Sequence, residues 1–133
     1  MLPDTRATGR LPKYNPERRS TFSIEDWRHV CCLASCALHE CALTATIQWI
    51  DEAGQLPAPR KSDQDKLDAC LCLLVALHLA ERKACLMVGD RLTGYIVVPY
   101  GDILYEELAT RCQGTGRDPA DWLQRFQLAP TAP

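Results

Sequence analysis

The sequence predicts an α+β fold that is mostly helical and carries one β-hairpin. Apolar residues recur at helical spacing through most of residues 23–80, which favours helices there. Two short apolar runs, Cys85–Val88 and Tyr95–Val98, flank a stretch rich in turn residues, which is typical of a hairpin. The chain has 133 residues, of which 47% are hydrophobic and 24% charged, so we expect a globular protein.

The domain organisation follows from where the periodicity starts and stops. Residues 1–21 are broken by glycine and prolines and predict an extended N-terminal arm, residues 22–128 predict a single domain, and residues 129–133 predict a tail. The arm is locally basic. We interpret it as a solvated segment because its cations are scattered, and contact with a polyanion is the alternative.

The first helical region opens at Ser23, which can cap a helix, and Asp26 three residues later resembles a capping box with a shorter acid. Helical spacing continues through Ala37, and a second stretch carries Leu43, Ile47 and Ile50 before it stops near Gly54. One long helix and two helices that break near His39 are both compatible with this pattern.

A long apolar run follows the proline-containing loop Gly54–Ser62. Residues Ala69–Leu77 are apolar on every side, which predicts a central, buried helix. Such a helix needs cover all round, so we expect the other helices to collapse around it or two copies of the chain to pair. The cations in Glu81-Arg82-Lys83 suit its carboxyl end.

Two further helices are expected after the hairpin. Asp102 can cap a helix that places Leu104, Leu108 and Cys112 on one face and ends at Gly114. Asp118 followed by Pro119 is a cap with proline at the first helical position. We expect this last short helix to carry Trp122 and Phe126 four residues apart.

Charge and hydropathy exclude some classes of function. The formal net charge of -2 argues against strong nonspecific binding to nucleic acid but leaves room for a local basic patch. No apolar signal region follows Met1, and the longest apolar run is far shorter than a membrane span. We therefore expect a cytoplasmic protein with no membrane partner.

The eight cysteines predict reduced thiols. Most lie in apolar surroundings at helical spacing, where cysteine behaves as a small hydrophobic residue. A zinc site is the alternative, but the chain has no C-x-x-C pair. The nearest candidate set is Cys32 and Cys36, four residues apart, with His29 and His39 nearby.

The stretch KSDQDKLDA at 61–69 holds the strongest candidate functional residues. Asp65 and Asp68 lie three residues apart, so a helix presents both from the same face. A divalent cation would explain two acids there, and so would ordinary helix-start chemistry. Asp63 is expected to be a cap. Arg60 and Lys61 are candidate phosphate contacts for nucleic acid, or solvated loop cations.

The stretch DQDKLDACLCLLVALHLAER, followed by CLMVGDRLTGYIVVP, resembles the C-terminal part of the predicted RNase H-like nucleases, a domain-of-unknown-function family of bacteria and archaea with a RuvC-like core. The most specific piece is D-x-x-D-A at Asp65, Asp68 and Ala69, and the hairpin pattern G-D-x-x-x-G-Y-I-V-V-P supports the same family. The segments ATGRLPKY and FSIEDWR also look like this family, so the resemblance spans most of residues 7–127.

The resemblance implies the later portion of an RNase H-like fold that lacks its first strands. It makes Asp68 and Asp65 catalytic, metal-binding carboxylates for Mg²⁺ or Mn²⁺, with the metal expected only when the full domain is assembled. The family's first-strand aspartate has no counterpart, because the first 20 residues contain only Asp4 and Glu17 as acids. The resemblance therefore implies an isolated chain without activity that awaits a missing N-terminal segment or a second copy. A non-catalytic helical interaction module, or an oligomeric remnant, is the alternative.

Overall fold

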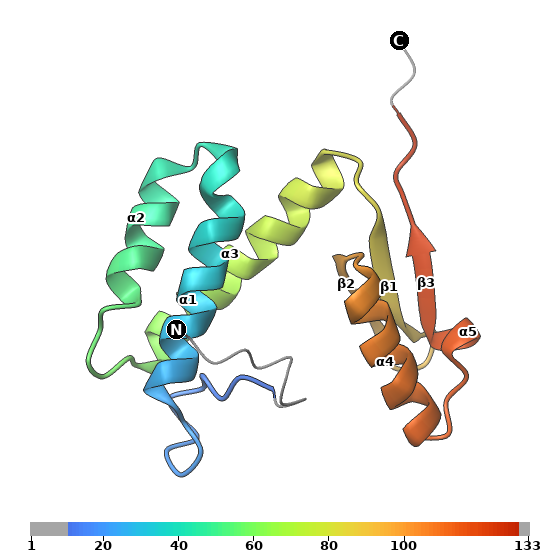
Figure 1. The fold of residues 1–133 in the computed structure, drawn as a ribbon, viewed down its shortest axis with the longest axis horizontal. Helices are drawn as coiled ribbons and strands as arrows, with labels where there is room; N and C mark the ends of the chain where they lie inside the picture. Colours follow the sequence, from blue (N-terminus) through green and yellow to red (C-terminus); the bar gives the residue numbers. More distant parts are fainter. Residues whose placement is uncertain (1–10, 131–133) are drawn as a thin grey trace. The chain divides into compact units, whose positions relative to one another are not determined.

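The computed structural model describes residues 11–130 and confirms an α+β protein that is mostly helical (Figure 1). The chain divides into two compact units, residues 1–74 and 75–133. The expected single domain over residues 22–128 stays a prediction, because two compact units can belong to one domain. The expected arm and tail fall partly on residues 1–10 and 131–133, outside the described residues.

Helix α1 spans Ile24–Leu38, and Ser23 is its N-cap as the sequence predicts. The Ser23 hydroxyl accepts the Asp26 backbone N–H at 3.2 Å, which satisfies one of the free donors of the first turn. The Asp26 carboxylate accepts the Lys13 backbone N–H at 2.7 Å, and the Ser23 N–H donates to the Lys13 carbonyl at 2.8 Å. The cap therefore also holds the preceding segment against the start of the helix.

The chain forms two helices here and not one long helix. A short 3₁₀ turn at His39–Cys41 (η1) follows α1, and Ala42 takes a left-handed conformation with φ of 55°. Helix α2 then spans Thr44–Ala53. The turn reverses the chain, so α2 runs back alongside α1 (Figure 1).

The core of the first unit is built around Trp27. Its side chain is 0% exposed, and its indole N–H donates to the Ala53 carbonyl at 2.8 Å, at the carboxyl end of α2. Aromatic side chains with a polar tip are stable in a core when that tip finds a partner. Three further aliphatic side chains are fully buried in the first unit: Leu38, Ile50 and Leu67.

Helix α3 spans Lys61–Ala80, and the expectation that it is a central, buried helix is wrong for its apolar part. Its buried residues are Gln64 and Leu67, whereas the run from Ala69 onward is half-buried or exposed, with Leu73 at 37%. Apolar composition on every side can be buried only if neighbours cover every side. In the described structure burial reaches only the part of α3 nearest its amino end.

The second unit contains the expected hairpin, formed by β1 (Cys85–Asp90) and β2 (Gly94–Pro99) in antiparallel register, with Leu86 opposite Val98. Gly89 is required by this geometry. Its φ is +135°, and an added Cβ would lie 2.0 Å from the Gly94 carbonyl oxygen.

The expected last helix is wrong beyond Trp122. Helix α5 spans only Pro119–Trp122, and the next residues form a third strand, β3 (Leu123–Phe126), which pairs with the free side of β1. The predicted hairpin is therefore part of a three-stranded antiparallel sheet of order β2-β1-β3. Ladder hydrogen bonds and the burial of Leu123 override the helical spacing of Trp122 and Phe126.

The ends of the two helices of this unit follow local chemistry. Helix α4 spans Asp102–Gly114 and ends where predicted, but its N-cap is Gly101, so Asp102 is its first residue and not its cap. The Asp118 carboxylate caps α5 as expected, because it accepts the Ala120 N–H at 2.9 Å with Pro119 at the first helical position.

Helix α4 covers one face of this sheet (Figure 1). The buried centre consists of Leu86 from β1, Cys112 from α4 and Leu123 from β3, so all three elements contribute. Half-buried side chains surround it: Val88, Val98, Tyr100, Tyr105, Leu108, Ala109 and Trp122.

Replacing Trp27 by phenylalanine tests whether the indole bond stabilises the first unit. We expect Trp27→Phe to lower the free energy of unfolding by about 0.5–1.5 kcal/mol, because the indole hydrogen bond is lost while the Ala53 carbonyl keeps the Leu56 N–H at 3.2 Å. Urea denaturation followed by circular dichroism measures the change. Trp49→Phe, at a half-buried position, is the control, and an equal loss in both variants would contradict a special role for the bond.

Candidate functional site

The candidate site lies at the amino end of α3, and Asp63 is the cap that the sequence predicts. Its carboxylate accepts the Arg60 backbone N–H at 2.8 Å, and its own N–H donates to the Arg60 carbonyl at 3.0 Å. The backbone of Arg60 is therefore fixed at the start of the helix, and the residue is exposed. Helix-start chemistry accounts fully for Asp63.

Lys61 forms an ion pair with Asp65. Their charged atoms lie 3.1 Å apart one helical turn from each other, with the side chains 43% and 63% exposed. The Lys61 ammonium also donates to the Gln64 side chain at 3.1 Å. The hydrogen bond to Asp65 raises the pKa of Lys61, and the negative charges of Asp65, Glu17 and Asp68 raise it further. The pair is exposed, so it adds little stability by itself.

Asp68 has a different partner. The hydroxyl of Tyr14 donates to Asp68 Oδ1 at 2.9 Å, across 54 positions of sequence. Burial raises the pKa of Tyr14 to about 12, and the hydrogen bond and charge of Asp68 add to the effect. The phenol thus stays protonated at neutral pH and remains the donor of the hydrogen bond to Asp68.

Acidic side chains surround the Lys61 ammonium group. Three carboxylates, those of Glu17, Asp65 and Asp68, act on one ammonium group. Among residues 11–130, no cluster of at least three histidine, cysteine or acidic side chains has the geometry to hold a metal ion. The described site therefore offers at most part of a cation's ligand shell, and Lys61 already supplies a positive charge next to it.

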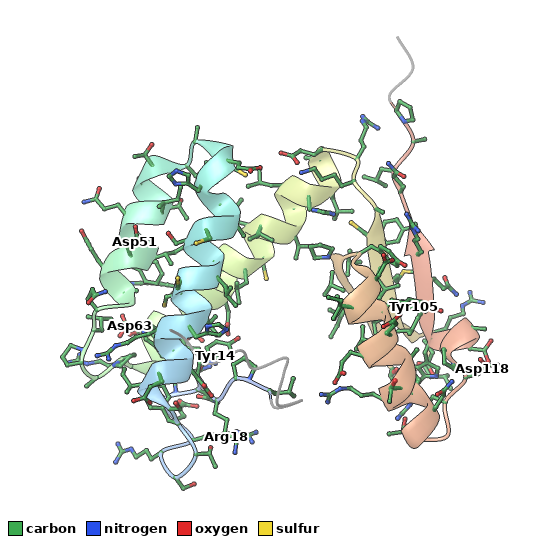
Figure 2. All side chains as sticks on the ribbon, viewed as in Figure 1. Tyr14, Arg18, Asp51, Asp63, Tyr105 and Asp118 are labelled. Atoms are coloured by element: carbon green, nitrogen blue, oxygen red, sulfur yellow. The ribbon has the colours of Figure 1, made fainter. Side chains whose placement is uncertain are left out.

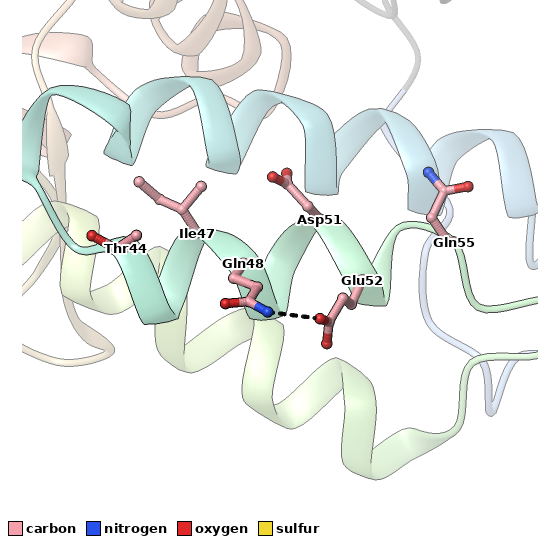
Figure 3. Close-up of a pocket in the computed structure, with 6 residues that line it drawn as sticks. All are labelled: Thr44, Ile47, Gln48, Asp51, Glu52 and Gln55. Carbon is pink, nitrogen blue, oxygen red and sulfur yellow. Dashed lines mark hydrogen bonds between the residues drawn. The ribbon is translucent and has the colours of Figure 1, made fainter.

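Two hollows of the described surface lie elsewhere. One, of about 490 Å³, runs along α2, where Gln48 donates to the Glu52 carboxylate at 3.2 Å (Figure 3). The other, of about 420 Å³, lies between α1 and α2. None of Arg60, Lys61, Asp65 and Asp68 lines either of these two hollows, whereas Cys32 and Cys36 line the second.

Sequence reasoning missed two residues at this site, Tyr14 and Glu17. Both belong to the irregular segment before α1, where Figure 2 labels Tyr14. No local pattern connects them with α3. The Lys61–Asp65 pair, in contrast, has a signal in the sequence. A cation and an acid four residues apart on a helix are neighbours on its surface.

All eight cysteines are free in the structure, and their reduced state stays a prediction. Cys31, Cys85 and Cys112 are buried, while Cys32, Cys36 and Cys72 are exposed. Within residues 11–130, no helix combines the length and apolar character needed to cross a membrane.

Comparison of the chain with protein-family models, curated proteins and solved structures finds no match. The resemblance to RNase H-like nucleases therefore stays a prediction that rests on the residues quoted for it.

The contact between Tyr14 and Asp68 can be tested by titrating the phenol. We expect Tyr14 to ionise near pH 12, and Asp68→Asn to move its pKa down towards the ordinary value, because the negative charge beside the phenol is removed. Ultraviolet difference spectra between each protein and its Tyr14→Phe counterpart isolate this tyrosine from the other three.

The sign of the accompanying stability change follows from the raised pKa. The folded chain keeps a proton that the unfolded chain loses, so the contribution of Tyr14 is present below about pH 10 and is lost between about pH 10 and 12. A Tyr14 that ionises near pH 10 in both backgrounds would show that the contact does not form.

Proposed function

We propose that this chain is the later part of a metal-dependent RNase H-like (RuvC-like) nuclease in which Asp68 and Asp65 bind Mg²⁺ or Mn²⁺. The observation that carries the proposal is the D-x-x-D-A element near the start of α3, with Asp65 exposed and Asp68 half-buried. Carboxylate oxygens from one face of a helix are suitable ligands for a hard divalent cation.

The chemistry requires more than these two acids. Phosphodiester hydrolysis by two metal ions needs cations at both the attacking and the leaving oxygen, held by acids from several elements. Asp65 and Asp68 supply part of one ligand shell. The remaining oxygens must come from residues beyond those described or from another chain, so the isolated chain is proposed to be inactive.

Lys61 gives the proposed site a second feature. Its ammonium is bound to Asp65 and lies within the electrostatic influence of Asp68, so an incoming cation competes with it. A phosphate of the nucleic acid would provide a new partner for the displaced ammonium, and Arg60 lies next to it in the sequence. Metal and substrate binding would then favour each other.

A titration with Mn²⁺ tests the proposal. We expect weak binding that Asp68→Asn reduces by about tenfold or more, since substitutions even in the outer shell of a metal site typically cost 10–100-fold. We expect Lys61→Met to strengthen binding, because it removes the competing cation. Lys66→Met is the matched control, since Lys66 is an exposed lysine on the same helix.

Equal Mn²⁺ affinity in the parent chain and Asp68→Asn would mean that the two acids are structural groups. Hydrolysis of DNA or RNA by the chain alone would contradict its proposed incompleteness. Both results come from one set of purified proteins.

A non-catalytic interaction module that pairs with a second copy is the second candidate, and β2 favours it. This strand is an edge of the sheet, with Tyr95 at 44% exposure and Ile96 at 68%. The Tyr100 N–H donates to the Ala84 carbonyl at 3.0 Å, so the alternation of the ladder directs the backbone groups of Tyr95 and Val97 outward. An edge without charged residues is suited to pairing with another strand.

The edge proposal predicts self-association that depends on the Val97 N–H. We expect the chain to dimerise in sedimentation equilibrium and Val97→Pro to be monomeric, because proline removes an outward donor without breaking the ladder to β1. Ile103→Ser, at a residue of α4 that is 64% exposed, controls for a general loss of apolar surface. A monomeric parent chain would exclude this candidate.

A further inference from the structure

Two exposed thiols form a pair on the surface of α1. Cys32 and Cys36 are separated by one helical turn, which places their Cβ atoms about 5–6 Å apart. Both side chains are exposed, so both sulfur atoms can be reached from solvent. In the whole sequence this is the one pair of cysteines at a spacing of three or four residues.

The pair borders a hollow. The space of about 420 Å³ between α1 and α2 is lined on the α1 side by Arg28, Cys31, Cys32, Ser35 and Cys36, and on the α2 side by Asp51 among others. A small ion can therefore reach both sulfur atoms from solvent without any movement of the helices.

The number of donors selects the kind of ion. Structural zinc requires four ligands, and no cluster of at least three suitable side chains exists among residues 11–130. Soft thiolate ligands favour Cu(I), a d¹⁰ ion that is stable with two sulfur ligands. Hard cations such as Mg²⁺ prefer oxygen, which separates this pair from the acids of α3.

We propose that Cys32 and Cys36 bind one Cu(I) ion as a two-coordinate dithiolate on the exposed face of α1. Each S–H bond breaks as a Cu–S bond forms, and both protons pass to solvent. Copper stays Cu(I) and both sulfur atoms stay at the thiolate level, so no electron is transferred. The proposal is independent of the nuclease proposal, since it uses neither Asp65 nor Asp68.

The surroundings of the pair suit this product. A dithiolate complex of Cu(I) carries one negative charge, and Arg28, one turn before Cys32, lines the same hollow and supplies a positive charge. Asp51 opposes the charge, but its carboxylate accepts a hydrogen bond from the Ser35 hydroxyl at 2.6 Å.

The third thiol of the hollow does not join the ligand set. Cys31 is only 2% exposed, whereas Cys32 and Cys36 are exposed. Among residues 11–130 no three such side chains form a group that could hold a metal ion, so Cys31 does not complete a set of three with the pair. The expected coordination number is two and not three.

An anaerobic competition experiment with a chromogenic Cu(I) chelator tests the site on the full chain. We expect one Cu(I) per chain, and a loss of affinity of about tenfold or more in Cys32→Ser and in Cys36→Ser, because each variant retains only half of the donors. Cys72→Ser is the matched control and should bind as the parent does, since Cys72 is exposed on a different helix.

Three results would overturn the proposal or its coordination number. Copper retained at parental affinity in Cys32→Ser, or lost equally in Cys72→Ser, would overturn the proposal. X-ray absorption at the copper edge should report two sulfur neighbours, and a third would overturn the two-coordinate assignment. Substitution of exposed thiols by serine should leave the circular dichroism unchanged, which separates ligand loss from unfolding.

Discussion

The first unit depends on a buried hydrogen bond between Trp27 and Ala53. It fixes α1 against the carboxyl end of α2. Leu67 of α3 is also fully buried, and the acids of α3 lie within a few residues of it, so its burial constrains where they can lie. The segment before α1 is held by the Ser23 and Asp26 contacts to Lys13, the neighbour of Tyr14. The candidate site is thus a consequence of core packing.

The acids at the start of α3 illustrate how one residue pattern can serve two purposes. Asp63 is explained by capping, whereas Asp65 and Asp68 have partners in Lys61 and Tyr14. Each partner supplies positive charge or a hydrogen-bond donor, which are the interactions that stabilise a carboxylate. The position of Asp65 and Asp68 is therefore the same whether they are structural groups or metal ligands. The two roles differ in whether a metal cation can displace Lys61.

Local chemistry could be predicted from the sequence, and long-range pairing could not. The cap at Ser23, the hairpin with Gly89 and the cap at Asp118 depend on neighbours within a few residues, so their patterns are visible. The spacing of Trp122 and Phe126 predicts a helix where β3 forms. The pairing of β3 with β1 joins distant segments, so no local pattern reveals it. Tyr14 was missed for the same reason, since nothing in its own sequence context identifies Asp68 as its partner.

The exposure of the apolar part of α3 connects the proposed functions. A helix apolar on every side, with Leu73 at 37% exposure, leaves surface that gains free energy when it is covered. A further segment of an RNase H-like domain would cover it while also bringing acids towards Asp68, whereas a second copy would cover it without adding chemistry. In the first case metal binding and burial of this surface must be coupled, because one segment supplies both. In the second case they are independent, since pairing at an apolar surface changes no ligand of Asp68.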